Sequence, residues 1–208
     1  MKNASKYADI LKSLCRAFAK EEKAAPIQKM DPLRALVRGA MSYGVSDARA
    51  DEAMRHIDRE FVNINELRVA TELEIQEMLG AKYPAIEQRV QMITRCLNAI
   101  FEKEHTLSLD RLRTISKRDA RQYLRDLPDM NPFVEGYVML FAFEGQAIPL
   151  DEEMLAYLRE QGMFDEKTTV DEAQRFLESN VKAEECYDFY TCLRRLAMSD
   201  TRPRKKTK

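Results

Sequence analysis

The sequence predicts an all-α protein, and three observations support that fold class. Apolar residues recur at helical spacing in nearly every segment. Residues that favour the N-cap position of a helix precede many of these segments. Only six glycines and seven prolines occur in 208 residues, whereas an all-β sandwich or barrel would need more turn residues. This length suits one compact domain or two small lobes with a buried core.

In the first half of the chain, each predicted helix has its own start signal. Asp31 followed by Pro32 provides an N-cap side chain and a proline at the first helical position. Ser46 predicts the N-cap of the next helix, Thr71–Glu74 has capping-box spacing, and Pro84 opens a long helix. The apolar stripes that follow are Leu33, Leu36, Val37, Ala40 and Met41; Ala50, Ala53, Met54 and Ile57; and Ile86, Val90, Ile93, Leu97 and Ile100.

The second half continues the helical pattern. Ser116–Asp119 has capping-box spacing, and Thr169–Glu172 is a second such box. Between them, the pattern of Leu124–Asp151 predicts a helix, a tight turn at Pro128 to Asn131, an apolar helix and a loop that ends on an aspartate. A last helix is expected over residues 183–197. We predict nine to eleven helices and find no convincing strand pattern.

Charge and cysteine usage limit the possible functions. The formal charge is −1, but the segment Thr201–Lys208 holds five basic residues and no acid, which leaves −6 on the rest. We expect this tail to be disordered, and it is the best electrostatic candidate for nucleic-acid contact. The N-terminus is polar and no long apolar run follows, so we expect a cytoplasmic protein without membrane contact. The four cysteines are then expected to be reduced thiols.

The segment Leu124–Asp151 resembles the DNA-binding hairpin and catalytic aspartate of the helix-hairpin-helix DNA glycosylases, the endonuclease III superfamily. Ala40–Asp47 resembles an earlier helix and turn of that family, and Tyr83–Ile100 resembles its following long helix. The likeness covers about Leu33 to Cys192. It implies a six-helix lobe at residues 31–146, a second lobe made of 1–30 and 147–200, and a cleft lined by the hairpin and Asp151.

The resemblance also implies DNA as a partner and assigns site residues. The hairpin turn, Pro128 to Asn131 with Asp129 and Met130 between them, would contact the DNA backbone. Gly44 stands where many members have a polar residue that fills the gap left by an extruded base. Other implied roles are Asp151 as the catalytic carboxylate, Phe133 as a DNA-contact residue beside the hairpin, and Lys117 and Arg121 as phosphate-binding side chains on the preceding helix.

Several residues depart from the family pattern. Asp129-Met130-Asn131 replaces the usual Gly, apolar residue, Gly, which weakens the approach of backbone N–H groups to a phosphate. Phe133 replaces the lysine of members that also cleave the strand, and a phenyl ring cannot form a Schiff base. Of the four cysteines in the family's iron–sulfur loop, only the first has a counterpart here, Cys192. We therefore expect no cluster, no metal and no other cofactor.

Simpler interpretations stand beside each functional one. Asp151 is also an ordinary helix N-cap, Phe133 an ordinary core residue, and the basic side chains before the hairpin a solvated helix face. Three hypotheses therefore remain: a monofunctional DNA glycosylase without lyase activity; a catalytically inactive relative that binds DNA or a protein; and an unrelated helical interaction protein. No Gly-rich phosphate loop, zinc pattern or nucleophile elbow points to another enzyme class.

Overall fold

A computed structural model describes residues 4–21 and 25–199, and over these ranges the protein is helical with no strand. The predicted all-α fold is confirmed. The predicted disordered tail, residues 201–208, lies outside the described residues. Two 3₁₀ helices, η1 (Asp110–Thr114) and η2 (Ala183–Glu185), accompany the α-helices. The α-helices are α1 (Ala4–Phe18), α2 (Pro32–Ser42), α3 (Asp47–Glu60), α4 (Ile64–Val69), α5 (Glu72–Leu79), α6 (Ile86–Glu104), α7 (Lys117–Arg125), α8 (Pro132–Phe141), α9 (Glu152–Glu160), α10 (Val170–Asn180) and α11 (Cys186–Ala197).

Side-chain caps begin many of these helices where the sequence predicts them. Asp31 accepts a hydrogen bond from the backbone N–H of Arg34 at the start of α2. Thr71 and Thr169 each form a complete capping box, for α5 and α10. The long helix α6 begins two residues after Pro84, because Ala85 adopts a left-handed conformation with φ of +49°. Local hydrogen bonding therefore sets most helix starts.

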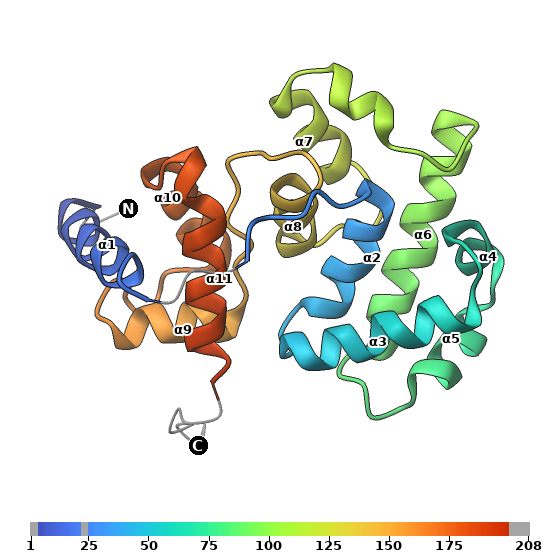
Figure 1. The fold of residues 1–208 in the computed structure, drawn as a ribbon, viewed down its shortest axis with the longest axis horizontal. Coiled ribbons are helices and arrows are strands. Elements are labelled where there is room, and N and C mark those ends of the chain that lie inside the picture. Colours follow the sequence, from blue (N-terminus) through green and yellow to red (C-terminus); the bar gives the residue numbers. More distant parts are fainter. Residues whose placement is uncertain (1–3, 22–24, 200–208) are drawn as a thin grey trace. The chain divides into compact units, whose positions relative to one another are not determined.

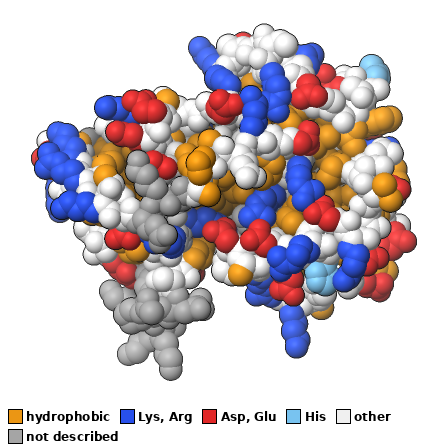
Figure 2. Space-filling model, viewed as in Figure 1, with side chains coloured by type: hydrophobic (Ala, Val, Ile, Leu, Met, Phe, Trp, Pro, Cys, Tyr) orange, Lys and Arg blue, Asp and Glu red, His pale blue; other side chains and the backbone are white. Residues whose placement is uncertain are grey.

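The chain divides into two compact units: residues 28–145 form the larger one, and the described residues of 1–27 and 146–208 form the smaller one. Within the larger unit, α2 packs against α3, α6 and α8 (Figure 1). Apolar side chains of these helices make its core, among them Leu36, Met41, Ile93 and Leu97. On the face drawn in Figure 2, Lys and Arg side chains of this unit lie among Asp and Glu side chains.

In the smaller unit, α11 packs against α1 and α9. Tyr7 of α1 meets Phe164 and Phe176 edge to face, with ring centroids 5.3 and 6.1 Å away. The Tyr7 hydroxyl also donates to the Asp165 carboxylate at 3.2 Å. These contacts join the N-terminal helix to segments that lie far along the chain. Among the described helices, none is both long and apolar enough to cross a membrane.

Gly39 lets α2 approach α8 closely. A Cβ atom at position 39 would lie 3.2 Å from both Cβ and Cγ of Tyr137. We expect Gly39→Ala to lower the free energy of unfolding by about 1–2 kcal/mol, because overpacking costs about 1–3 kcal/mol and exceeds the gain of about 1 kcal/mol in helix propensity. Urea denaturation measures the change. A more stable variant would contradict the close approach described here.

Candidate functional site

Helices α7 and α8 flank a tight turn at the predicted position, within the larger unit. The turn is closed by backbone hydrogen bonds from Leu127 to Leu124 at 3.2 Å and from Met130 to Leu127 at 3.3 Å. Asn131 then caps α8, since its side-chain oxygen accepts from the N–H of Phe133 at 2.8 Å. Pro132 occupies the first position of α8, where a missing N–H costs nothing. Two helices joined by a short capped turn are thus present.

Asp129 takes a left-handed conformation, at the position where the resemblance places the first hairpin glycine. Its φ is +56°, a region that aspartate tolerates better than most residues. Its carboxylate accepts from Nη1 of Arg95 on α6 at 2.8 Å, and both side chains are about half exposed. The turn therefore keeps a glycine-like backbone at this position. The negative charge that Asp129 adds is balanced by an arginine beside it.

Cys96 of α6 forms a hydrogen bond to the backbone of the turn. Its thiol is buried and donates to the carbonyl oxygen of Pro128 at 3.2 Å. Burial, together with the nearby charge of Asp129, raises the pKa of this thiol to about 12. The group is therefore a protonated donor at neutral pH and not a nucleophile. It ties the predicted contact residue Pro128 to the middle of α6.

Three of the four basic side chains of α7 make contacts with α8 or the residues just after it. Arg121 and Arg125 both bind the carboxylate of Glu135, which is 2% exposed. Lys117 donates its ammonium to the carbonyl oxygen of Phe143, just after α8. Arg121 and Lys117 therefore lie in contacts that hold the two helices together. Sequence reasoning missed Glu135, although a carboxylate within the apolar run Phe133–Phe141 was a signal.

Phe133, which the resemblance places beside the hairpin as a DNA-contact residue, does not reach the surface of the larger unit. Its side chain is 1% exposed. The ring packs edge to face on Tyr43, with centroids 5.5 Å apart, and stacks on Tyr137 at 6.1 Å. The aromatic ring is thus a core element that joins α2 to α8. Position 133 offers neither a lysine nor an exposed aromatic ring.

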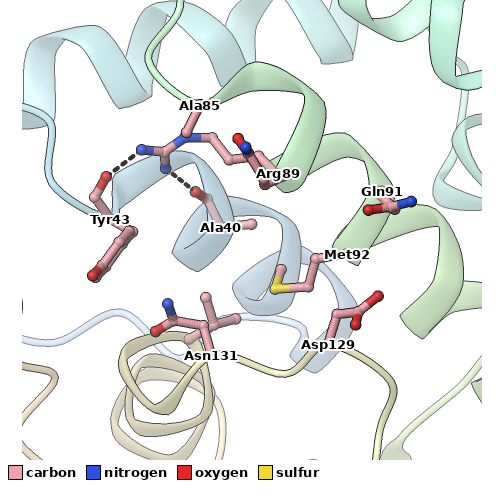
Figure 3. A pocket seen from close by; sticks show the side chains of 10 residues that line it. Ala40, Tyr43, Ala85, Arg89, Gln91, Met92, Asp129 and Asn131 are labelled. Atoms are coloured by element: carbon pink, nitrogen blue, oxygen red, sulfur yellow. Dashed lines mark hydrogen bonds between the residues drawn. The ribbon is translucent and has the colours of Figure 1, made fainter.

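Gly44 follows α2 in an exposed turn. Its φ is +62°, and a Cβ atom there would meet nothing within 4 Å. The position needs glycine for its backbone conformation and not for lack of space. Its neighbour Tyr43 faces a pocket of about 380 Å³ beside the hairpin turn (Figure 3).

This pocket collects residues from three segments of the larger unit. The lining residues are Ala40, Tyr43, Ala85, Gln88, Arg89, Gln91, Met92, Asp129, Asn131 and Val134. Of the predicted contact residues, Asp129 and Asn131 are therefore brought together with Tyr43. Sequence reasoning missed Tyr43 and the two glutamines, because no local pattern marks them.

Asp151 belongs to the smaller unit and begins α9. Its Oδ1 accepts from the N–H of Met154 at 2.9 Å, as an N-cap does. Its Oδ2 lies 3.8 Å from Nη1 of Arg194 on α11, and the two side chains are 1% and 3% exposed. The carboxylate is therefore both a helix cap and half of a buried ion pair. The arginine partner had no sequence signal.

Among residues 4–21 and 25–199, no group of three or more His, Cys, Asp or Glu side chains is arranged to hold a metal ion. Cys192, the residue matched to the iron–sulfur loop, is a buried free thiol on α11. Burial raises the pKa of this thiol, while Arg195 beside it acts in the opposite direction.

Neither a family model nor a curated protein matches the sequence. Solved structures do match. A trapped endonuclease III–DNA covalent intermediate aligns with a TM-score of 0.70 at 14% identity, over 94% of this chain and 86% of that one. A thermostable thymine-DNA glycosylase gives 0.68 at 15% identity, over 98% and 92%. An H. pylori 3-methyladenine DNA glycosylase bound to 1,N6-ethenoadenine gives 0.66 at 14%, over 90% and 94%.

Proposed function

From the fold that this chain shares with the helix-hairpin-helix DNA glycosylases, we infer that the protein binds duplex DNA through the hairpin of its larger unit. The observation that carries the proposal is the turn itself. Asp129 holds a left-handed backbone, with φ of +56°, where the family pattern has glycine. We propose that this turn places the start of α8, where the helix dipole favours anions, against a DNA phosphate.

The charges around the turn set the strength of this binding. The Asp129 carboxylate would repel a phosphate. Nη1 of Arg95 lies 2.8 Å from Oδ2 of Asp129 and supplies a compensating positive charge. Arg121 and Arg125 are engaged with Glu135, so fewer cations serve the DNA than the sequence of α7 suggests. We therefore propose modest affinity that falls with salt, because each phosphate contact releases counterions. Pro128, Met130, Asn131 and Gly44 complete the proposed contact surface.

Replacing Asp129 with glycine tests the proposal most directly. We expect Asp129→Gly to tighten binding to a labelled 20-base-pair duplex about fivefold to tenfold at low salt, since it removes a negative charge and keeps the backbone conformation. Arg95→Gln should weaken binding and reduce the slope of log affinity against log salt by about 1. Fluorescence anisotropy across a salt series measures both effects.

Glu77→Gln on α5 is the charge-matched control, because it also removes one exposed negative charge from the larger unit. If this control tightens binding as much as Asp129→Gly, only the net charge matters and the hairpin has no special role. A chain that ends at Asp200 tests the basic tail. Loss of all DNA binding in that truncated chain would overturn the hairpin proposal.

Base excision without strand cleavage is the second candidate function. Its support is the position of Asp151 at the N-terminus of α9, which matches the family aspartate in the resemblance above. Phe133 at the lysine position argues against the lyase step. Duplexes that carry a panel of damaged or mismatched bases test it, with alkaline cleavage revealing abasic sites. Excision that disappears in Asp151→Asn under conditions where circular dichroism shows the variant to be folded supports catalysis, and intact duplexes throughout leave DNA binding as the function.

A further inference from the structure

We propose that helices α4 and α5 of the larger unit form a docking surface for a basic amphipathic helix of a partner protein. Among residues 4–21 and 25–199, the large apolar side chains that stand exposed all lie between the end of α3 and the last turns of α6. They are Val62, Val69, Leu73 and Phe101, with exposed fractions from 38% to 87%, and we call them the apolar patch. Exposed apolar side chains that gather in one region are typical of protein–protein contact sites.

The periodicity of the two short helices explains why these side chains are exposed. In α4, Val69 stands two residues after the buried Leu67. In α5, Leu73 stands two residues before the buried Ile75. Two residues correspond to about 200° of rotation around a helix, so Val69 and Leu73 point away from the core. A connection of only two residues separates the helices, which keeps the two apolar side chains in one region.

Contacts with α6 fix the two helices and place Phe101 beside them. Arg68 of α4 donates to the side-chain oxygen of Asn98 at 2.9 Å, and its guanidinium lies 4.2 Å from the centroid of the Phe101 ring. The Thr94 hydroxyl donates to the Glu72 carboxylate of α5 at 3.3 Å. Positions 94, 98 and 101 share one face of α6. Phe101 therefore lies on the side of α6 against which α4 and α5 pack.

Acidic side chains border the apolar patch. Glu66 precedes Val69 by three residues on α4, and exposed Glu77 follows Leu73 by four residues on α5. Each carboxylate therefore shares a helix face with an exposed apolar side chain. Residues 62–79 contain four glutamates and one basic residue, an arginine. An apolar centre with an acidic border complements a helix whose apolar stripe is flanked by Lys and Arg.

The same charges argue against other occupants. The glutamates would repel DNA phosphates and the anionic headgroups of a membrane. A two-fold dimer would bring the same surface of both copies together, so the acidic borders would face each other. The basic segment 201–208 contains no Val, Leu, Ile, Met or aromatic residue that could cover an apolar patch. A different protein with both basic and apolar side chains is the occupant that fits.

The apolar patch is separate from the hairpin within the larger unit. Figure 1 draws α4 and α8 on opposite sides of α6. The docking surface therefore goes beyond the proposed DNA binding and does not depend on it. We expect Asp129→Gly, which changes the hairpin turn, to leave docking on α4 and α5 unchanged.

Binding of a designed peptide to the full chain tests the docking surface. The probe is a fluorescein-labelled peptide of leucine and lysine, about 18 residues long, with its leucines on one helix face. The control peptide has the same composition in scrambled order. In fluorescence anisotropy, we expect the probe to bind at least about tenfold more tightly than the control. Leu73→Ser should weaken probe binding about fivefold, because it removes exposed apolar area from the patch.

A second pair of variants tests the acidic border. The double variant Glu66→Gln with Glu77→Gln should weaken probe binding about tenfold at low salt, and less at 1 M salt, where exposed charges are screened. The matched control is Glu152→Gln with Glu166→Gln, which removes two exposed negative charges from the smaller unit. We expect this control to change probe binding by less than about twofold.

Four results would overturn the assignment. Equal binding of the probe and the scrambled peptide, or unchanged binding in Leu73→Ser, would exclude an apolar docking surface. Equal weakening by the two glutamate pairs would mean that only net charge attracts the probe. A dimer that Leu73→Ser dissociates in sedimentation would assign the patch to a second copy of the chain. Tighter probe binding by the chain that ends at Asp200 would show that the basic tail occupies the surface.

Discussion

Asp151→Asn is expected to lower the free energy of unfolding by about 2–4 kcal/mol, because it removes the negative charge that faces the buried Arg194 guanidinium. Both side chains are at most 3% exposed, so water cannot replace the lost partner. The helix cap should survive, since an asparagine oxygen can still accept from the N–H of Met154. Urea denaturation followed by circular dichroism measures the loss.

A matched control separates capping from charge. Asp31 caps α2 in an exposed position, with a bond of 2.9 Å from the N–H of Arg34. We expect Asp31→Asn to cost less than about 0.5 kcal/mol, because asparagine and aspartate cap almost equally well. The double variant Asp151→Asn with Arg194→Met should regain most of the stability. A fully stable Asp151→Asn single variant would show that the ion pair contributes nothing, and it would strengthen the catalytic alternative for this carboxylate.

Removing the carboxylate of Glu135 is expected to have a comparable effect in the larger unit. We expect Glu135→Ala to lower the free energy of unfolding by about 1.5–3 kcal/mol, because it removes the charge-assisted hydrogen bonds that Arg121 and Arg125 make to α8. Arg121 is 19% exposed and Arg125 is 49% exposed. Arg121→Ala should therefore cost more than Arg125→Ala, whose charge is better solvated. Denaturant titration of the three variants gives the ranking.

The proposed DNA binding gives a second measurement for Glu135→Ala, in which the expected result is opposite to the effect of net charge. Glu135→Ala makes the protein more positive, so simple electrostatics predicts tighter DNA binding. We expect weaker binding instead, because α7 loses its ion pairs to α8 and the turn between them is less well held. Glu77→Ala changes the charge equally on α5 and should not weaken binding. Tighter binding by Glu135→Ala would mean that the released arginines, and not the geometry of the hairpin, control affinity.

Much of the helical framework could be predicted because its signals are local. The side chains of Asp31, Thr71, Ser116 and Thr169 cap the helices that they precede, since a cap needs only an N–H two or three residues away. The hairpin turn also lies where Pro128 to Asn131 predicts it. The backbone of Asp129 was harder to predict, because only the folded turn holds an aspartate at φ of +56°.

The site depended on partners that are distant along the chain. The sequence by itself determined an all-α protein with a capped hairpin and an aspartate at the start of α9. Only the tertiary structure decided that Phe133 is buried, that Arg121 faces Glu135, that Asp151 meets Arg194, and that Tyr43 joins Asn131 around one pocket. The physical reason is range: capping and periodicity act within a few residues, whereas desolvation and ion pairing depend on which helix faces meet.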